Sequence, residues 1–188
     1  LAAIKKNKSF DHAARLFTLS GTSLPSYWLG PLLVYIFALK LDWLPISERG
    51  GLDHLILPAV TLSIGLMAVL AQVTRAAMLE VMKEDFVQTA RAKGASETQI
   101  YFRHALANAA IPIITVAALQ FGAVLTGTVI VETIFDWPGL GTLLFQGIQN
   151  RDYPLVQGCV LVIALIYVLV NFSAEVLYAW ANPKVRLD

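Results

Sequence analysis

Residue types that support catalysis are sparse in this sequence of 188 residues. Its three histidines, His12, His54 and His104, are far apart in the chain and lie at or outside the ends of long uncharged segments. The single cysteine, Cys159, cannot form an internal disulfide. No Gly-Lys-Ser/Thr run, which would cradle phosphates, is present. The sequence therefore predicts no catalytic site, no metal and no cofactor, and it does not favour an intramembrane enzyme.

One polar segment carries signals for a defined backbone structure. It reads Gln88-Thr-Ala-Arg-Ala-Lys-Gly94, followed after one residue by Ser96-Glu-Thr-Gln99. Glycine directly after two cations is typical of a helix C-terminus, because glycine tolerates the left-handed conformation and cations favour the negative helix end. Ser96 and Gln99 have the spacing of a capping box, which starts a new helix. The segment is therefore predicted to be a helix–glycine turn–helix, in which Glu97 is interior to the box and expected to tolerate replacement.

The residues before this turn suggest what the hairpin does. Leu79, Met82, Phe86 and Ala90 share one helical face, so a helix continues or restarts up to Lys93. Apolar side chains beside a sharp turn suit insertion into a groove of another protein. The alternative is an amphipathic hairpin on the membrane surface with no partner.

The composition places this hairpin in a membrane protein. Hydrophobic residues make up 57% of the chain and charged residues only 14%, with a mean hydropathy of +0.65. No Asp, Glu, Lys or Arg occurs in 16–39, 54–74, 104–131 or 153–174. Each block is at least as long as the roughly 20 residues that cross a hydrocarbon core. We expect one all-α transmembrane domain over 1–188, with spans at about 16–40, 55–75, 105–131 and 154–175, and a cytoplasmic loop at 76–104.

The basic residues predict the orientation. The polar segments that must share one side hold 11 of the 14 Lys and Arg residues. The positive-inside rule then places both ends and the middle loop in the cytoplasm. Positions Lys8, Gly94 and Lys184 are predicted inside, and Arg49 and Asn150 outside. A net charge of +1 gives no sign of nucleic-acid binding.

Few polar residues lie within the predicted spans or at their ends. No ionisable residue lies near the centre of a span, which argues against a proton-coupled pump or a voltage-gated channel. Gln120 and Glu132 are candidates for a translocation path, although interhelical hydrogen bonding is the commoner role of a polar residue such as Gln120. Beyond the third block, Pro138-Gly139 predicts a turn, and Thr142 is expected to cap a short helix through Gly147.

Several motifs resemble one transporter family. The hairpin, followed by His104-Ala-Leu106, resembles the EAA motif of permease subunits of ATP-binding-cassette (ABC) importers. It keeps Ala90, Gly94 and Leu106 at the right spacing, and it departs at Gln88, Thr89, His104 and Ala107. The form of the oligopeptide, dipeptide and nickel permeases is matched further by Trp137-Pro-Gly-Leu-Gly141, Arg151-Asp-Tyr-Pro154 and Asn182-Pro-Lys-Val-Arg186. The resemblance covers essentially the whole chain, and the ending is similar to that of the first permease subunit.

This resemblance implies a fold, a function and partners. The fold would be the transmembrane helix bundle of a type I ABC importer permease, with four of an expected six spans. The chain would be a non-enzymatic permease subunit for peptides or related solutes in the bacterial inner membrane. Its partners would be a second permease subunit, two cytoplasmic ATPase subunits and an extracytoplasmic binding protein. Coupling to the ATPase would fall to residues 89–94, namely Thr89, Ala90, Arg91, Ala92, Lys93 and Gly94. The alternative is an ATP-independent carrier or channel subunit.

Overall fold

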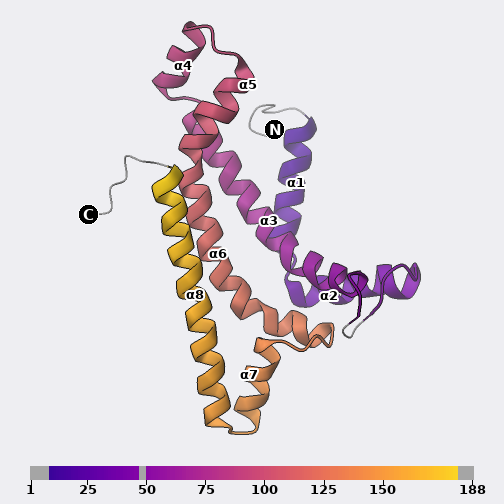
Figure 1. The fold of residues 1–188 in the computed structure, drawn as a ribbon. Helices are drawn as coiled ribbons and strands as arrows, with labels where there is room; N and C mark the ends of the chain where they lie inside the picture. The colour runs from indigo at the N-terminus through magenta and orange to yellow at the C-terminus, as the bar shows by residue number, and fades with distance from the viewer. Residues whose placement is uncertain (1–8, 47–49, 182–188) are drawn as a thin grey trace. The chain divides into compact units, whose positions relative to one another are not determined.

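The computed structural model describes residues 9–46 and 50–181, without the side chains of 10, 123, 125–127 and 177–181. Over these residues the chain is helical and contains no strand (Figure 1). The predicted all-α class is therefore confirmed. The topology predictions at Lys8, Arg49 and Lys184 lie outside the described residues.

The elements follow one another with short connections. They are α1 (Ser9–Ser23), α2 (Ser26–Leu33), the π-helical η1 (Val34–Lys40), α3 (Asp53–Val81), α4 (Asp85–Ala92), α5 (Glu97–Gln99), the π-helical η2 (Ile100–Ala105), α6 (Leu106–Ile134), α7 (Leu140–Gln149) and α8 (Tyr153–Ala181). Within the described ranges, three helices are long and apolar enough to cross a membrane, namely Asp53–Val81, Glu97–Gly122 and Tyr153–Val176. A fourth span is present if the bent pair of helices at the start of the chain counts as one.

The first apolar segment is broken where a proline interrupts it. Pro25 has extended backbone angles and lacks the N–H that would continue α1. Its carbonyl accepts hydrogen bonds from the amides of Trp28 and Leu29, which start α2. The helix pair is bent by 105° at this break.

The chain packs as two compact units. Among the described residues, the first unit comprises 9–19, 68–119 and 170–181. Its core contains Ala77, Met78, Ala105 and Ala109, all of them buried. Small side chains at most of these positions let helix backbones approach closely in the absence of a hydrophobic driving force.

A buried ion pair adds to the packing of the first unit. The Asp11 carboxylate is fully buried and accepts hydrogen bonds from Arg75 Nε at 2.7 Å and Arg75 Nη2 at 2.9 Å. Arg15 approaches the same carboxylate at 3.3 Å. The bidentate geometry satisfies a charge that would be costly to bury alone. It joins α1 to α3 within this unit.

The second unit comprises residues 20–67 and 120–169. Its core is built by Leu29, Leu33, Ala38, Leu57, Val131 and Phe135, each less than a tenth exposed. Gln120 donates from Nε2 to the carbonyl oxygen of Leu66 at 3.2 Å, so α6 and α3 share an interhelical hydrogen bond here. Tight turns in this unit use left-handed residues other than glycine, which among the described residues are Asp42, Asp136 and Arg151.

Candidate functional site

The candidate docking hairpin begins where α3 ends at Val81. Residues 82–84 form a turn, and Glu84 is extended before α4 restarts at Asp85. The apolar face expected from the sequence is therefore divided between two helices, with Leu79 on α3 and Phe86 and Ala90 on α4. Val87 anchors α4 by being fully buried, whereas the Phe86 side chain is 39% exposed.

Gly94 ends α4 as the sequence predicts. Its φ is +84°, in the left-handed region that side-chain-bearing residues rarely adopt. The Ala95 amide donates to the Ala90 carbonyl at 3.1 Å and the Gly94 amide to the Arg91 carbonyl at 2.9 Å. These two bonds form the Schellman pattern of a glycine-terminated helix. The backbone conformation at Gly94 is what reverses the chain direction.

The second arm of the hairpin starts with the predicted capping box. The Gln99 amide donates to Ser96 Oγ at 3.4 Å, and the Ser96 amide donates to Gln99 Oε1 at 3.2 Å. The short α5 then continues through η2 into α6. Because the second arm continues into a long helix, movement of the turn can be passed directly to α6.

A side-chain pair joins the two arms across the turn. Arg91 donates from Nε to Glu97 Oε1 at 2.6 Å and from Nη2 to Glu97 Oε2 at 3.1 Å. The hydrogen bonds that Arg91 donates to Glu97 raise the pKa of Arg91 further above its ordinary value, so the guanidinium stays charged. Because Glu97 makes this contact, its interior position in the capping box is not a sufficient reason to expect that its replacement is tolerated.

Most of the predicted coupling residues lie on the outside of the hairpin. Thr89, Arg91, Ala92, Lys93 and Gly94 are exposed, and Ala90 is half-buried. A shallow cavity of about 400 Å³ lies beside them, lined by Phe86, Thr89, Ala90, Lys93, Ala95 and His104. The hairpin thus presents a mixed apolar and basic surface that the described residues of its own unit leave exposed.

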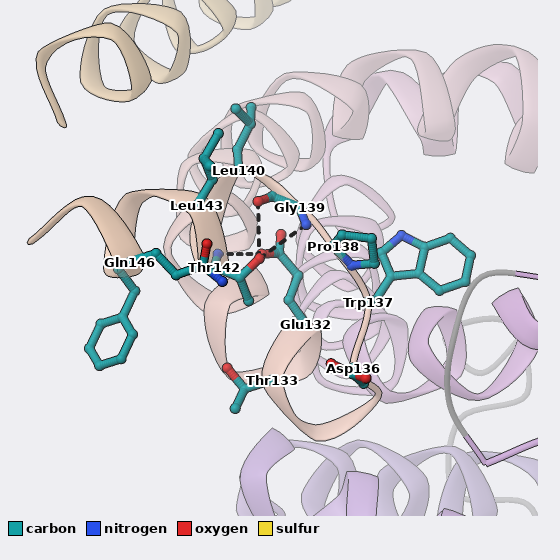
Figure 2. A pocket seen from close by; sticks show the side chains of 11 residues that line it. Glu132, Thr133, Asp136, Trp137, Pro138, Gly139, Leu140, Thr142, Leu143 and Gln146 are labelled. Atoms are coloured by element: carbon teal, nitrogen blue, oxygen red, sulfur yellow. Dashed lines mark hydrogen bonds between the residues drawn. The ribbon is translucent and has the colours of Figure 1, made fainter. Parts of the chain in front are cut away.

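A second candidate region lies at the start of α7. Figure 2 shows the Glu132 side chain of α6 pointing toward the segment from Gly139 to Thr142. Glu132 Oε2 accepts a hydrogen bond from the Thr142 amide at 2.7 Å. Thr142 Oγ1 in turn bonds the Gly139 backbone, accepting from its amide at 3.1 Å and donating to its carbonyl at 3.0 Å. A carboxylate on free amides of a first helical turn is a favourable arrangement.

Close approach of Glu132 explains the two glycines of this loop. A Cβ on Gly139 would collide with the Glu132 carboxylate. A Cβ on Gly141 would lie 2.6 Å from Val129 Cγ2 and 3.0 Å from both Val129 Cα and Glu132 Oε2. The cavity beside the loop has a volume of about 820 Å³ and includes Asp136, Trp137 and Phe145 in its lining (Figure 2). Through its bonds to the Gly139 backbone, Thr142 assists the start of α7. This helix runs to Gln149, two residues beyond the predicted end at Gly147.

The two residues predicted for a translocation path both have partners inside the second unit. Gln120 bonds the Leu66 carbonyl, and Glu132 bonds the Thr142 amide. Their role in a path stays a prediction. Sequence reasoning missed the Glu132–Thr142 and Arg91–Glu97 contacts. The second had a signal, because opposite charges flanking a glycine turn are brought together when the turn closes.

The arrangement of these residues suits binding to another protein and transmission of movement. Among the described residues, no group of three or more His, Cys, Asp and Glu side chains could hold a metal ion. The distinctive features are long apolar helices and an exposed helix–glycine–helix hairpin leading into one of them. These features are typical of helical transport subunits of membranes.

Comparison with known proteins gives the family. Residues 1–187 match the model of the binding-protein-dependent transport system inner membrane component. The chain belongs to this family, and the resemblance to importer permeases recognised in the sequence is confirmed.

Two relatives illustrate the similarity. The chain is 42% identical to the di/tripeptide transport system permease protein DppB of Pseudomonas aeruginosa (strain UCBPP-PA14), over 99% of this chain and 64% of the relative. It is 43% identical to the glutathione transport system permease protein GsiC of Escherichia coli (strain K12), over 99% of this chain and 61% of the relative. The chain thus spans somewhat less than two thirds of the length of these relatives.

Proposed function

We propose that this chain is part of a permease subunit of an ABC importer, and that it forms part of the path for small peptides across the bacterial inner membrane. The observation that carries this proposal is the exposed hairpin centred on Gly94, whose second arm continues into α6. A rigid turn leading directly into a membrane-length helix suits the transfer of motion from a cytoplasmic ATPase. Family membership supports the same reading.

The proposal assigns ATP hydrolysis to a partner and docking to this chain. Thr89, Ala90, Ala92, Lys93 and Gly94 lie against the ATPase, with Phe86 and Ala90 supplying the apolar contact. The basic side chains on this surface suit an acidic rim on the partner. The complete assembly contains a second permease subunit, two ATPases and an extracytoplasmic binding protein. The structure offers no observation that favours an ATP-independent carrier or channel.

The proposed substrate class comes from the relatives. One is named for di- and tripeptide transport and the other for glutathione transport. Both names denote small peptides with a free ammonium and a free carboxylate. We propose solutes of this size and chemistry, with final selectivity set by the binding protein.

Site-directed cross-linking tests the docking proposal. Cysteines placed singly at Ala92 and Lys93 in the full-length subunit should cross-link to the ATPase in the assembled complex. A cysteine at Asn150, at the far end of α7, should not. Impermeant thiol labelling of sealed cells should reach Asn150 but not Gly94. Cross-linking to the ATPase from Asn150 alone, or external labelling at position 94, would reverse the proposed orientation.

A further inference from the structure

Arg91 differs from its neighbours in the docking hairpin because it contacts Glu97. Thr89, Ala92 and Lys93 place their side chains at the surface without an ion pair to the second arm. Arg91 instead uses two guanidinium nitrogens on Glu97, at 2.6 and 3.1 Å. A bidentate arginine–carboxylate pair fixes relative orientation as well as distance.

The orientation of α4 relative to the second arm depends on which contacts span the turn. Gly94 reverses the chain, and only two residues separate it from the start of α5. The Schellman bonds and the capping box define each arm separately, and neither joins a side chain of α4 to the second arm. The pair of Arg91 and Glu97 makes such a link. It therefore spans the turn from α4 to the helix that leads into α6.

We infer that Arg91 and Glu97 form a brace that positions α4 relative to α6, and that Arg91 acts through this brace rather than by contacting the ATPase. The inference rests on the proposed coupling function of the hairpin. Both are positioning residues, because each acts through the other.

Exposure explains why the brace acts on coupling more than on folding. The side chains of Arg91 and Glu97 are 42% and 51% exposed. An ion pair so exposed is screened by water and contributes little to stability. Docking of the ATPase over the hairpin removes that water and strengthens the pair. The brace is thus weak in the free subunit and stiff in the state that must transmit force.

Charge exchange in the assembled complex tests the inference. The full-length subunit is reconstituted with its second permease, ATPases and binding protein. Arg91→Glu and Glu97→Arg should each lower binding-protein-stimulated ATP hydrolysis and uptake by about threefold to tenfold, as expected when one member of a coupled pair is removed. The double variant should recover to within about twofold of wild type. The amount of assembled complex should stay unchanged in all three.

Conservative variants refine the result. Arg91→Lys keeps the charge but loses the fork, so it should couple less well than wild type and better than Arg91→Glu. Thr98→Ala and Arg103→Gln are matched controls on the same arm, since neither belongs to the brace, and both should behave as wild type.

The outcomes separate the brace from the coupling function itself. If both single variants are defective and the double variant is not restored, Arg91 contacts the ATPase directly and the brace is wrong. If both single variants couple normally while Ala90→Glu does not, the hairpin couples without a brace. If Ala90→Glu and all the charge variants couple normally, the proposed coupling function fails as well.

Discussion

The docking hairpin and the loop before α7 both depend on glycine, for opposite physical reasons. At Gly94 the backbone has φ of +84° and no atom lies within 4 Å of an added Cβ. At Gly139 the backbone is extended, with φ of −142°, but the Glu132 carboxylate occupies the place of a Cβ. Gly94 is required by conformation and Gly141 by space, because backbone of α6 lies against it, whereas the group that crowds Gly139 is the end of a flexible side chain.

This difference shows how each region is held. The hairpin keeps its shape through local backbone bonds and an exposed ion pair, and it leaves its outer surface uncovered. The loop keeps its shape because a carboxylate from α6 reaches the first turn of α7. The first arrangement suits a surface that a partner must reach, and the second suits a rigid connection between α6 and the short α7.

The largest expected effect falls on the crowded glycine. Gly141→Val places a side chain against Val129, including its Cα, which cannot move without shifting α6. Overpacking of this kind costs about 3 kcal/mol. The variant should show reduced abundance in the membrane and a lower unfolding midpoint in detergent.

Gly158→Val is the matched control for this variant. A Cβ at Gly158 has no neighbour within 4 Å, so the protein should remain as abundant as wild type. Equal abundance of both variants would mean that the close approach at Gly141 does not exist.

The next largest effect is expected at Gly94, where a substitution should change coupling rather than folding. Gly94→Val forces a β-branched residue into the left-handed region at a cost of about 1–3 kcal/mol. We expect membrane abundance near wild type, and stimulated ATP hydrolysis and peptide uptake reduced by about tenfold.

Gly94→Asn sharpens this test, because asparagine tolerates left-handed backbone. It should retain most of the uptake. If the valine and asparagine variants are equally active, backbone conformation at this turn does not control coupling.

The smallest effect tests the partnership between Glu132 and Gly139. Gly139→Ala should lower the free energy of unfolding by about 1 kcal/mol, because the carboxylate can swing aside only by weakening its bond to the Thr142 amide. Glu132→Ala should also be destabilising, since it leaves that amide without its acceptor. In the Glu132→Ala background, Gly139→Ala should have almost no further effect, because the colliding group is gone. If thermal unfolding shows that the losses of stability in the two single variants add in the double variant, Glu132 and Gly139 do not interact.

Much of the hairpin was predictable from the sequence. The stop at Gly94 and the box of Ser96 and Gln99 depend on residues within a few positions of one another, so local spacing identified both. The Arg91–Glu97 pair follows only once the turn has closed and two helical arms are placed side by side. The π-helical segments η1 and η2 carry no comparable signal, because their extra residue per turn is a response to packing.

The loop before α7 was predictable only in part. Its turn at Pro138 and Gly139 was expected, and so was a helix after it. The sequence predicts Glu132 only as a candidate for a translocation path and does not indicate that it is the partner of that helix. Its contact with the Thr142 amide joins residues ten positions apart across a loop, and no local pattern encodes it.

The sequence by itself determined that this chain is an all-helical membrane protein of the importer permease family, because apolar length, charge placement and short motifs are local properties. Only the tertiary structure decided which polar groups meet. Asp11 with Arg75, Gln120 with the Leu66 carbonyl and Glu132 with the Thr142 amide are all brought together by helices packing. A polar group in a poorly hydrated interior must find a partner, and folding, not spacing along the chain, selects that partner.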